Sequence, residues 1–152
     1  MSFVDRDRPT GGLNVGNLAP DFRIPATAGE DGVRRLSDLR GHYVLVSFWA
    51  GYDAPSRMAN VALSNALRRA DGGQQQIEMV SVSFDEYRSV FEETVREDGI
   101  QAVACFQEAK GADSRIYGKY RLERGFTTYL LDERGVIVAH GLTPAELAEY
   151  ID

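Results

Sequence analysis

Cysteine is almost absent from this sequence of 152 residues, in which Cys105 is the only one. A single cysteine excludes a disulfide within the chain, and it also excludes a catalytic cycle in which two thiols of one chain oxidise each other. Cys105 lies in the apolar stretch A-V-A-C-F, and free cysteines are among the residues most often buried in folded proteins. We therefore expect a buried thiol that reacts slowly.

Other kinds of functional site are missing as well. The sequence has two histidines, His42 and His140, and its carboxylates lack the compact spacing of metal ligands, so no metal site is predicted. The glycines at positions 11, 12 and 16 precede no G-K-[ST] motif, which excludes a phosphate-binding loop of that type. We expect no cofactor.

Charge and hydropathy exclude two classes of partner. The 23 acidic residues outnumber the 17 basic ones, and the basic residues are scattered apart from the pairs Arg34–Arg35 and Arg68–Arg69. A nucleic-acid-binding surface needs them clustered, so no nucleic-acid partner is expected. No apolar run approaches the roughly 20 residues of a membrane span, and no signal peptide is visible. The compartment stays open between the cytoplasm and a cell envelope reached through a leader that has been removed.

The elements that are present indicate one α/β domain. Residues 1–17 are polar and rich in glycine, so we expect a flexible N-terminal arm, followed by a folded domain over residues 18–152. Apolar runs and turn signals predict short extended pieces at 22–24 and 32–36, strands at 43–49 and 77–84, helices at 54–70 and 86–98, a hairpin of 127–132 and 136–140, and a final helix that Thr143 caps. The second helix is predicted to face inward with five residues, Tyr87, Val90, Phe91, Thr94 and Val95.

The window F-W-A-G-Y-D-A-P-S-R, residues 48–57, is the most informative part of the sequence. An apolar strand ends in W-A-G-Y, and a helix then opens with Pro55 in its first turn. This window resembles the active site of the thioredoxin superfamily, whose redox members read W-A-S-W-C-G-P-C-R at this place. Asp53 and Ser56 stand where the two cysteines would be.

The resemblance continues along the chain and is closest to the bacterial envelope thiol-disulfide oxidoreductases and the related peroxiredoxin-like group, the alkyl hydroperoxide reductase and thiol-specific antioxidant proteins. The matching segments are G-N-L-A-P-D-F (16–22), L-S-D-L-R-G-H-Y-V-L-V-S-F-W-A (36–50), P-S-R (55–57) and T-T-Y-L-L-D-E-R-G-V-I-V-A-H-G (127–141). The resemblance implies a thioredoxin-like α/β fold with a central mixed sheet, helices on both faces and an N-terminal β extension. It also implies that residues 52–57 lie on the surface, where the central strand becomes a helix.

The same resemblance implies which chemistry has been lost. In a redox member the first cysteine is the nucleophile at the helix start, and the second resolves the mixed disulfide. A carboxylate at Asp53 does not exchange disulfides and a hydroxyl at Ser56 cannot form one, so we expect no catalytic residue here. The superfamily also has a cis-proline facing its dithiol, and Phe126 takes that place after Gly125. Because a cis bond before a residue other than proline costs about 2.5–4 kcal/mol, we expect a trans bond and a reshaped loop.

Three residues of the former active site each have two interpretations. Asp53 either caps the helix or is a fixed carboxylate that binds a cationic or hydrogen-bond-donating group of a partner. Ser56 either bonds locally to the backbone or acts as a nucleophile with Asp53 and a distant histidine. Trp49 either packs in the core or belongs to a surface groove. The residues expected in that groove are Trp49, Tyr52, Gly125 and Phe126.

Two functions therefore stay open, both within a bacterial family concerned with redox homeostasis. In the first, the chain is a thioredoxin-like module without the dithiol, which binds a protein or an extended peptide at the former active-site surface. In the second, it is a thiol-disulfide oxidoreductase or antioxidant-type enzyme that acts through Cys105 or through a partner. A peroxidase with one cysteine needs its thiol near a helix N-terminus and a basic neighbour, and the sequence around Cys105 shows neither, so we favour the first function.

Overall fold

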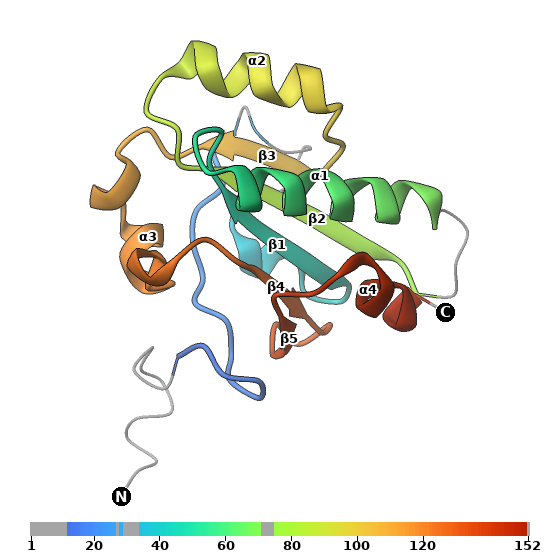
Figure 1. The fold of residues 1–152 in the computed structure, drawn as a ribbon. Helices are drawn as coiled ribbons and strands as arrows, with labels where there is room; N and C mark the ends of the chain where they lie inside the picture. Colours follow the sequence, from blue (N-terminus) through green and yellow to red (C-terminus); the bar gives the residue numbers. More distant parts are fainter. Residues whose placement is uncertain (1–11, 27, 29–33, 71–74, 152) are drawn as a thin grey trace, which may run out of the picture.

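The computed structural model of the chain has a mixed sheet with helices packed on it (Figure 1). It describes residues 12–26, 28, 34–70 and 75–151. The strands, in their order across the sheet, are β3 (Ala104–Gln107), β2 (Ile77–Ser83), β1 (Tyr43–Trp49), β4 (Thr128–Leu131) and β5 (Ile137–His140). The helices are α1 (Ala54–Arg69), α2 (Arg88–Asp98), α3 (Arg115–Lys119) and α4 (Pro144–Ile151), with short 3-10 turns η3 (Leu36–Leu39), η4 (Gly111–Asp113) and η5 (Leu122–Arg124). The predicted thioredoxin-like α/β architecture is confirmed.

The sheet is arranged around β1, the strand that the sequence marks most clearly. β1 pairs in parallel with β2 and antiparallel with β4, and all its residues after Tyr43 are buried. A strand that is covered on both faces needs apolar side chains on both, which explains the continuous apolar run. α1 connects β1 to β2, and α2 connects β2 to β3, so both connections move in the same direction across the sheet. Connections between parallel strands are almost always right-handed, which places α1 and α2 on the same face of the sheet.

Two apolar clusters fill the two faces of the sheet. One cluster lies between the sheet and the helices α1 and α4, and it includes Leu45, Leu63, Met79, Leu130, Leu147 and Ile151. On the opposite face, the N-terminal segment, η3 and α3 cover a larger cluster that includes Phe22, Leu36, Phe48, Phe106, Ile116 and Tyr120. The side chains of β1 alternate between the two clusters, because successive residues of a strand point to opposite faces.

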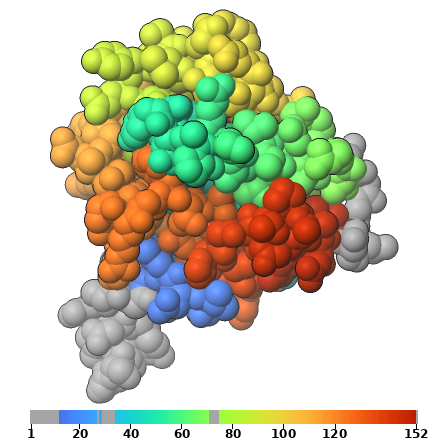
Figure 2. Space-filling view, viewed as in Figure 1, coloured from blue at the N-terminus to red at the C-terminus, as the bar shows by residue number. Residues whose placement is uncertain are grey.

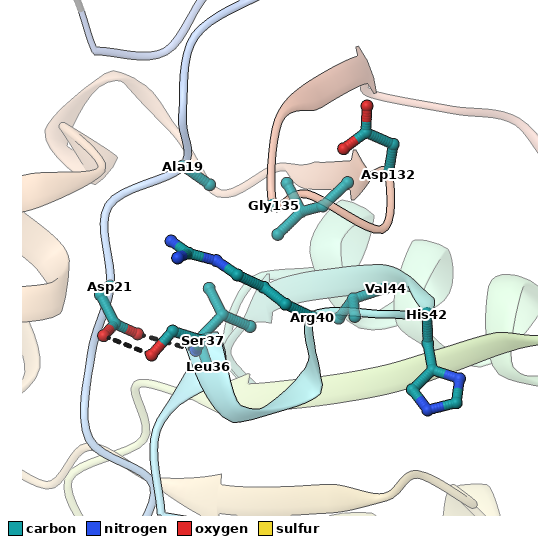
Figure 3. A pocket seen from close by; sticks show the side chains of 10 residues that line it. Ala19, Asp21, Leu36, Ser37, Arg40, His42, Val44, Asp132 and Gly135 are labelled. Atoms are coloured by element: carbon teal, nitrogen blue, oxygen red, sulfur yellow. Dashed lines mark hydrogen bonds between the residues drawn. The ribbon is translucent and has the colours of Figure 1, made fainter. Parts of the chain in front are cut away.

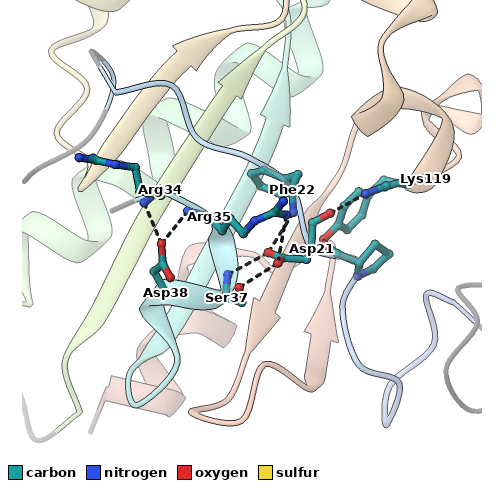
Figure 4. Close-up of polar contacts among 9 residues, drawn as sticks. Asp21, Phe22, Arg34, Arg35, Ser37, Asp38 and Lys119 are labelled. Carbon is teal, nitrogen blue, oxygen red and sulfur yellow. Dashed lines mark hydrogen bonds and ion pairs between the residues drawn. The ribbon is translucent and has the colours of Figure 1, made fainter. Parts of the chain in front are cut away.

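Asp21 fixes the N-terminal segment to η3 (Figure 4). Its carboxylate accepts hydrogen bonds from the backbone N–H and the hydroxyl of Ser37 at 2.9 and 2.8 Å, and the Arg35 guanidinium lies 3.6 Å away. Beside it, Arg23 and Arg35 form an isolated antiparallel bridge. These contacts make up the described part of the predicted N-terminal β extension, whose residues 32 and 33 lie outside the described residues.

Contacts with the sheet begin close to the predicted domain boundary at residue 18. The Gly16 N–H donates to the Ile137 carbonyl, and the Ile137 N–H donates to the Asn17 carbonyl, each at 2.9 Å. Residues 1–11 of the predicted flexible arm lie outside the described residues, so the division into an arm of 1–17 and a domain of 18–152 stays a proposal.

A small cavity lies between the N-terminal segment, η3 and the turn from β4 to β5 (Figure 3). The Arg40 side chain extends into it toward Gly135, whereas His42 points away. Its free space is about 10 Å³, which is the size of one water molecule. The cavity is therefore too small to bind a substrate.

The C-terminal elements agree with their prediction. β4 and β5 form the expected hairpin, and the turn between them places Gly135 at a φ of 83°, in the left-handed region. The Thr143 hydroxyl accepts a hydrogen bond from the Glu146 N–H at 3.1 Å, and the Glu146 carboxylate accepts one from the Thr143 N–H at 2.9 Å. This reciprocal cap fixes the start of α4.

The helix after β2 differs from its prediction. α2 begins at Arg88, so Tyr87 is its N-cap, and the side chain of Tyr87 is 72% exposed. Val90 is 43% exposed and Phe91 is half-buried, so the prediction that this helix buries Tyr87 and Val90 is wrong. Thr94, one turn further along and also predicted to face inward, is the buried residue of α2. Val90 lies in the first turn, where the helix borders a surface groove instead of the core.

Candidate functional site

Asp53 caps the helix that follows the central strand. Its carboxylate accepts a hydrogen bond from the Ser56 N–H at 3.1 Å, and its backbone is extended, as an N-cap requires. Pro55 lies in the first turn, where a residue without an N–H costs the helix nothing. Of the two interpretations of Asp53, the structure shows the capping one.

Ser56 is buried, and its hydroxyl is used within the loop. It accepts a hydrogen bond from the Ala50 N–H at 3.2 Å and donates one to the Asp53 carbonyl at 3.0 Å. No side chain of the described residues pairs with this hydroxyl as a base would. The structure therefore favours local backbone bonding over a nucleophilic serine.

Asp85 is a site residue that the sequence analysis missed. It is 3% exposed, and its two carboxylate oxygens accept hydrogen bonds from the Gly51 N–H at 3.0 and 2.9 Å. The Ser83 hydroxyl donates a further one at 2.8 Å. An acidic residue directly after the second apolar strand was the available signal, because the carboxyl ends of parallel β1 and β2 meet at one edge of the sheet.

Gly51 has little room for a side chain beside this carboxylate. A Cβ atom at Gly51 would lie 3.3 Å from Asp85 Oδ2 and 3.4 Å from the Thr94 hydroxyl oxygen. The close approach lets the Gly51 N–H reach Asp85, and it joins the loop after β1 to α2.

A groove of about 460 Å³ opens at this edge of the sheet. Its lining residues are Gly51, Tyr52, Asp85, Glu86, Tyr87 and Val90. Tyr52 and Tyr87 are 73% and 72% exposed, and both line the same groove, so their exposed aromatic rings form one patch instead of lying scattered on the surface. We call this feature the tyrosine groove.

Phe126 connects the tyrosine groove to the core. Its ring stacks on Phe84, with centroids 5.5 Å apart, and meets the rings of Tyr52 and Tyr117 edge-on at 6.3 Å each. The described residues contain no cis peptide bond, so the bond before Phe126 is trans, as predicted. Gly125 before it is exposed, with a φ of 123°.

Trp49 does not belong to this surface. It is fully buried, and its indole N–H donates to the Ser81 hydroxyl at 2.8 Å. Of its two interpretations the core one holds, so Trp49 is removed from the expected groove. Of the other three predicted groove residues, the structure brings the rings of Tyr52 and Phe126 together, with Gly125 next in the chain.

The tyrosine groove is electrostatically negative. Burial raises the pKa of Tyr52, and the neighbouring groups Tyr117, Asp85, Asp53 and Glu86 raise it further. The Tyr52 hydroxyl therefore stays protonated at neutral pH and is available as a hydrogen-bond donor.

Arg57 joins α1 to α2, another contact that the sequence analysis missed. Its guanidinium donates to the two carboxylate oxygens of Asp98 at 2.8 and 2.7 Å, and Glu97 lies 3.5 Å away. The Asp98 side chain is only 10% exposed, and its hydrogen bonds to the guanidinium raise the pKa of Arg57. Figure 2 shows α2 as a yellow ridge beside the start of α1.

Cys105 lies inside β3, away from any helix N-terminus. It is half-buried rather than fully buried as predicted, because β3 is the last strand at its end of the sheet. Burial raises the pKa of the Cys105 thiol to about 11, against a smaller opposite effect of the hydrogen bond with Ser81. The thiol is thus protonated at neutral pH, as its predicted slow reaction requires.

The described part of the chain has neither a cluster of metal ligands nor a helix suited to spanning a membrane. Within it, no group of three or more His, Cys, Asp or Glu side chains is placed to hold a metal ion. None of its helices combines the length and the apolar character needed to cross a bilayer.

Known proteins resemble the chain in both sequence and fold. The thioredoxin-like protein YneN of Bacillus subtilis is 30% identical over 134 residues, covering 83% of this chain and 70% of its own length. The thiol-disulfide oxidoreductase ResA of Oceanobacillus iheyensis is 26% identical, covering 91% of this chain and 71% of its own. A crystal structure of a thioredoxin-like protein from Parabacteroides distasonis is 38% identical, with a TM-score of 0.76, and covers 92% of this chain and 96% of that one.

The family assignment rests on more than these individual relatives. The sequence model of the AhpC/TSA family matches residues 15–140, which is most of the chain. The match includes the strand-to-helix junction at which Asp53 and Ser56 take the place of the two cysteines. The chain thus belongs to the AhpC/TSA family and has the thioredoxin-like fold of the thiol-disulfide oxidoreductases, with one cysteine in its whole sequence.

Proposed function

We propose that this chain is a non-catalytic thioredoxin-like protein that binds an extended peptide segment of a partner protein at the tyrosine groove. The single observation that carries the proposal is the exposure of Tyr52 and Tyr87 beside the former dithiol position. Tyrosine is enriched among the few residues that carry most of the binding energy at protein interfaces.

The groove also has the supports that a binding surface needs. The ring of Phe126 contacts the ring of Tyr52, and the rings of Phe84 and Tyr117 pack against Phe126 in turn, so part of the surface is preorganised. The Asp53 cap and the Asp85 contact with Gly51 fix the loop that carries Tyr52. A rigid loop loses less entropy on binding than a mobile one.

The alternative is an enzyme that works through Cys105. A thiol with a pKa of about 11 is almost entirely protonated at neutral pH, whereas the attacking species in disulfide or peroxide reduction is the thiolate. Cys105 also lies in β3, and it does not line the tyrosine groove. These observations support the binding function over the catalytic one.

The proposal is tested by titrating labelled protein with a library of blocked nonapeptides and following backbone amide shifts by NMR. We expect binding peptides to shift Gly51, Tyr52 and Phe126, and Tyr52→Ala to abolish the effect. Met58→Ala is the matched control, because Met58 is 70% exposed on α1 but does not line the groove.

Two results would overturn the proposal. One is the absence of any peptide that shifts the groove residues. The other is turnover of a disulfide or peroxide substrate that exceeds that of a free thiol and disappears in Cys105→Ser.

A further inference from the structure

The lining of the tyrosine groove includes two carboxylates without a matching cation. Asp85 and Glu86 both line it, and neither has an ion-pair partner among the residues that the structure describes. The hydrogen bonds of Asp85 come from the neutral Gly51 N–H and the Ser83 hydroxyl. Two hydrogen bonds from neutral donors leave its charge uncompensated.

The carboxylates of α2, the helix that follows Asp85 and Glu86, do have cations beside them. Asp98 is bound by Arg57, and Glu92 is bound by Arg88 at 3.0 Å. Among the acidic residues of this segment, those that line the tyrosine groove, Asp85 and Glu86, are therefore the ones without a cation in the described part of the chain.

The walls of the groove suit a cation that is carried on an apolar stem. Tyr52 and Tyr87 present exposed aromatic rings from two different loops, and a cation is attracted to the face of such a ring. Val90, also exposed, offers an apolar contact to methylene groups. Lysine and arginine side chains combine a methylene stem with a charged end.

We infer that the tyrosine groove binds a lysine or arginine side chain of the partner peptide, with its charged end toward Asp85 and Glu86 and its stem against Tyr52 and Tyr87. This inference rests on the proposed function and names the residue class that the groove selects. A glutamate would be repelled by the two carboxylates, and an apolar side chain would displace water from them without providing a counter-charge.

The test uses four blocked nonapeptides of alanine and glycine that differ only at the central residue: arginine, citrulline, lysine or norleucine. Citrulline keeps the shape of arginine without its charge, and norleucine keeps the four-carbon stem of lysine without its ammonium group. We expect each charged peptide to bind about tenfold more tightly than its neutral match, and the advantage to shrink as sodium chloride is raised. Affinity is measured by calorimetry and located by NMR shifts.

Matched variants distinguish an effect of the charge in the groove from an effect of the net charge of the protein. Glu86→Gln should bring the arginine-to-citrulline affinity ratio toward one, whereas Glu149→Gln, which removes the same charge from an exposed position of α4, should leave it unchanged. Tyr87→Leu should lower the ratio and Tyr87→Phe should keep it, because only the ring face is needed.

The outcomes distinguish this inference from the proposed function. Equal affinity for the charged and neutral peptides, with shifts in the groove, overturns the cation preference and leaves peptide binding standing. Absence of binding by all four peptides also overturns the cation preference, and the nonapeptide library then decides on the proposed function by itself. An equal effect of Glu149→Gln would reduce the preference to non-specific attraction and so contradict the inference.

Discussion

The guanidinium of Arg57 and the carboxylate of Asp98 join the start of α1 to the end of α2 through two hydrogen bonds of 2.8 and 2.7 Å. This pair lies at the side of the former active site, and its residues are separated by 41 positions in the sequence. It ties the helix that carries Val90, and with it one border of the tyrosine groove, to the helix that Asp53 caps.

Removing this pair should destabilise the protein more than removing an exposed one. Arg57→Ala leaves the Asp98 carboxylate, which is 10% exposed, without its cation, and we expect a loss of about 1–2 kcal/mol in the free energy of unfolding by urea. Arg88→Ala is the control, because Arg88 and Glu92 are mostly exposed and such pairs contribute about 0.5 kcal/mol or less. Equal losses in the two variants would contradict the prediction.

The capping role of Asp53 predicts a second stability effect. Asp53→Ala removes the acceptor of the Ser56 N–H and should cost about 0.5–2 kcal/mol in urea unfolding. Asp53→Asn keeps an acceptor oxygen at the same place and should retain most of the stability. An unchanged unfolding midpoint in Asp53→Ala would show that the cap has no energetic role.

Cys105 should react slowly with thiol reagents in the native protein. At pH 7 its thiol is far below a pKa of about 11, so labelling by a disulfide reagent should be much slower than in the unfolded chain and should accelerate as the pH rises. Labelling at pH 7 that matches the rate in denaturant would contradict this prediction.

The same raised pKa predicts a dependence of stability on alkaline pH. The folded protein favours the neutral thiol, so this stabilisation is present below the ordinary pKa of 9.0 and is lost as the pH rises through about 11. Comparison of the wild type with Cys105→Ser between pH 8 and pH 11, by urea unfolding, isolates the thiol from the tyrosines. Parallel curves for the two proteins would rule the effect out.

Restoring the dithiol should give a disulfide but poor catalysis. Asp53→Cys combined with Ser56→Cys recreates the spacing of the redox members, and we expect mass spectrometry of the oxidised protein to show the loss of two hydrogen atoms. Insulin reduction should stay weak because Phe126 occupies the loop of the cis-proline, and Phe126→Pro in addition should raise it. If the double variant cannot be oxidised, the alignment of this window is wrong.

Local patterns in the sequence predicted most strands and helices and part of the site, whereas the arrangement of these elements was implied by the resemblance to the thioredoxin superfamily. The unbroken apolar run of β1 predicted a central strand, and the Asp-Ala-Pro order predicted the cap of α1, because both depend on neighbouring residues. Phe126 could be placed because the hairpin after it fixes the alignment.

The remaining features depend on contacts between distant segments. The helical spacing of Tyr87, Val90 and Phe91 predicted burial, but periodicity does not say where a helix overhangs the end of a sheet. Nor does any local pattern connect Asp85 with Gly51, since their meeting follows from the parallel pairing of β1 and β2.

The use of Asp53 as a cap also has a consequence for single substitutions at the two former cysteine positions. A single change of Asp53 to cysteine would remove a stabilising hydrogen bond and supply no second thiol with which to pair. A single change of Ser56 to cysteine would put a larger, weakly bonding sulfur into a buried position that now binds the Ala50 and Asp53 backbone. We therefore expect each single change to lower the free energy of unfolding before a second cysteine is present, so a disulfide at this place requires both changes together.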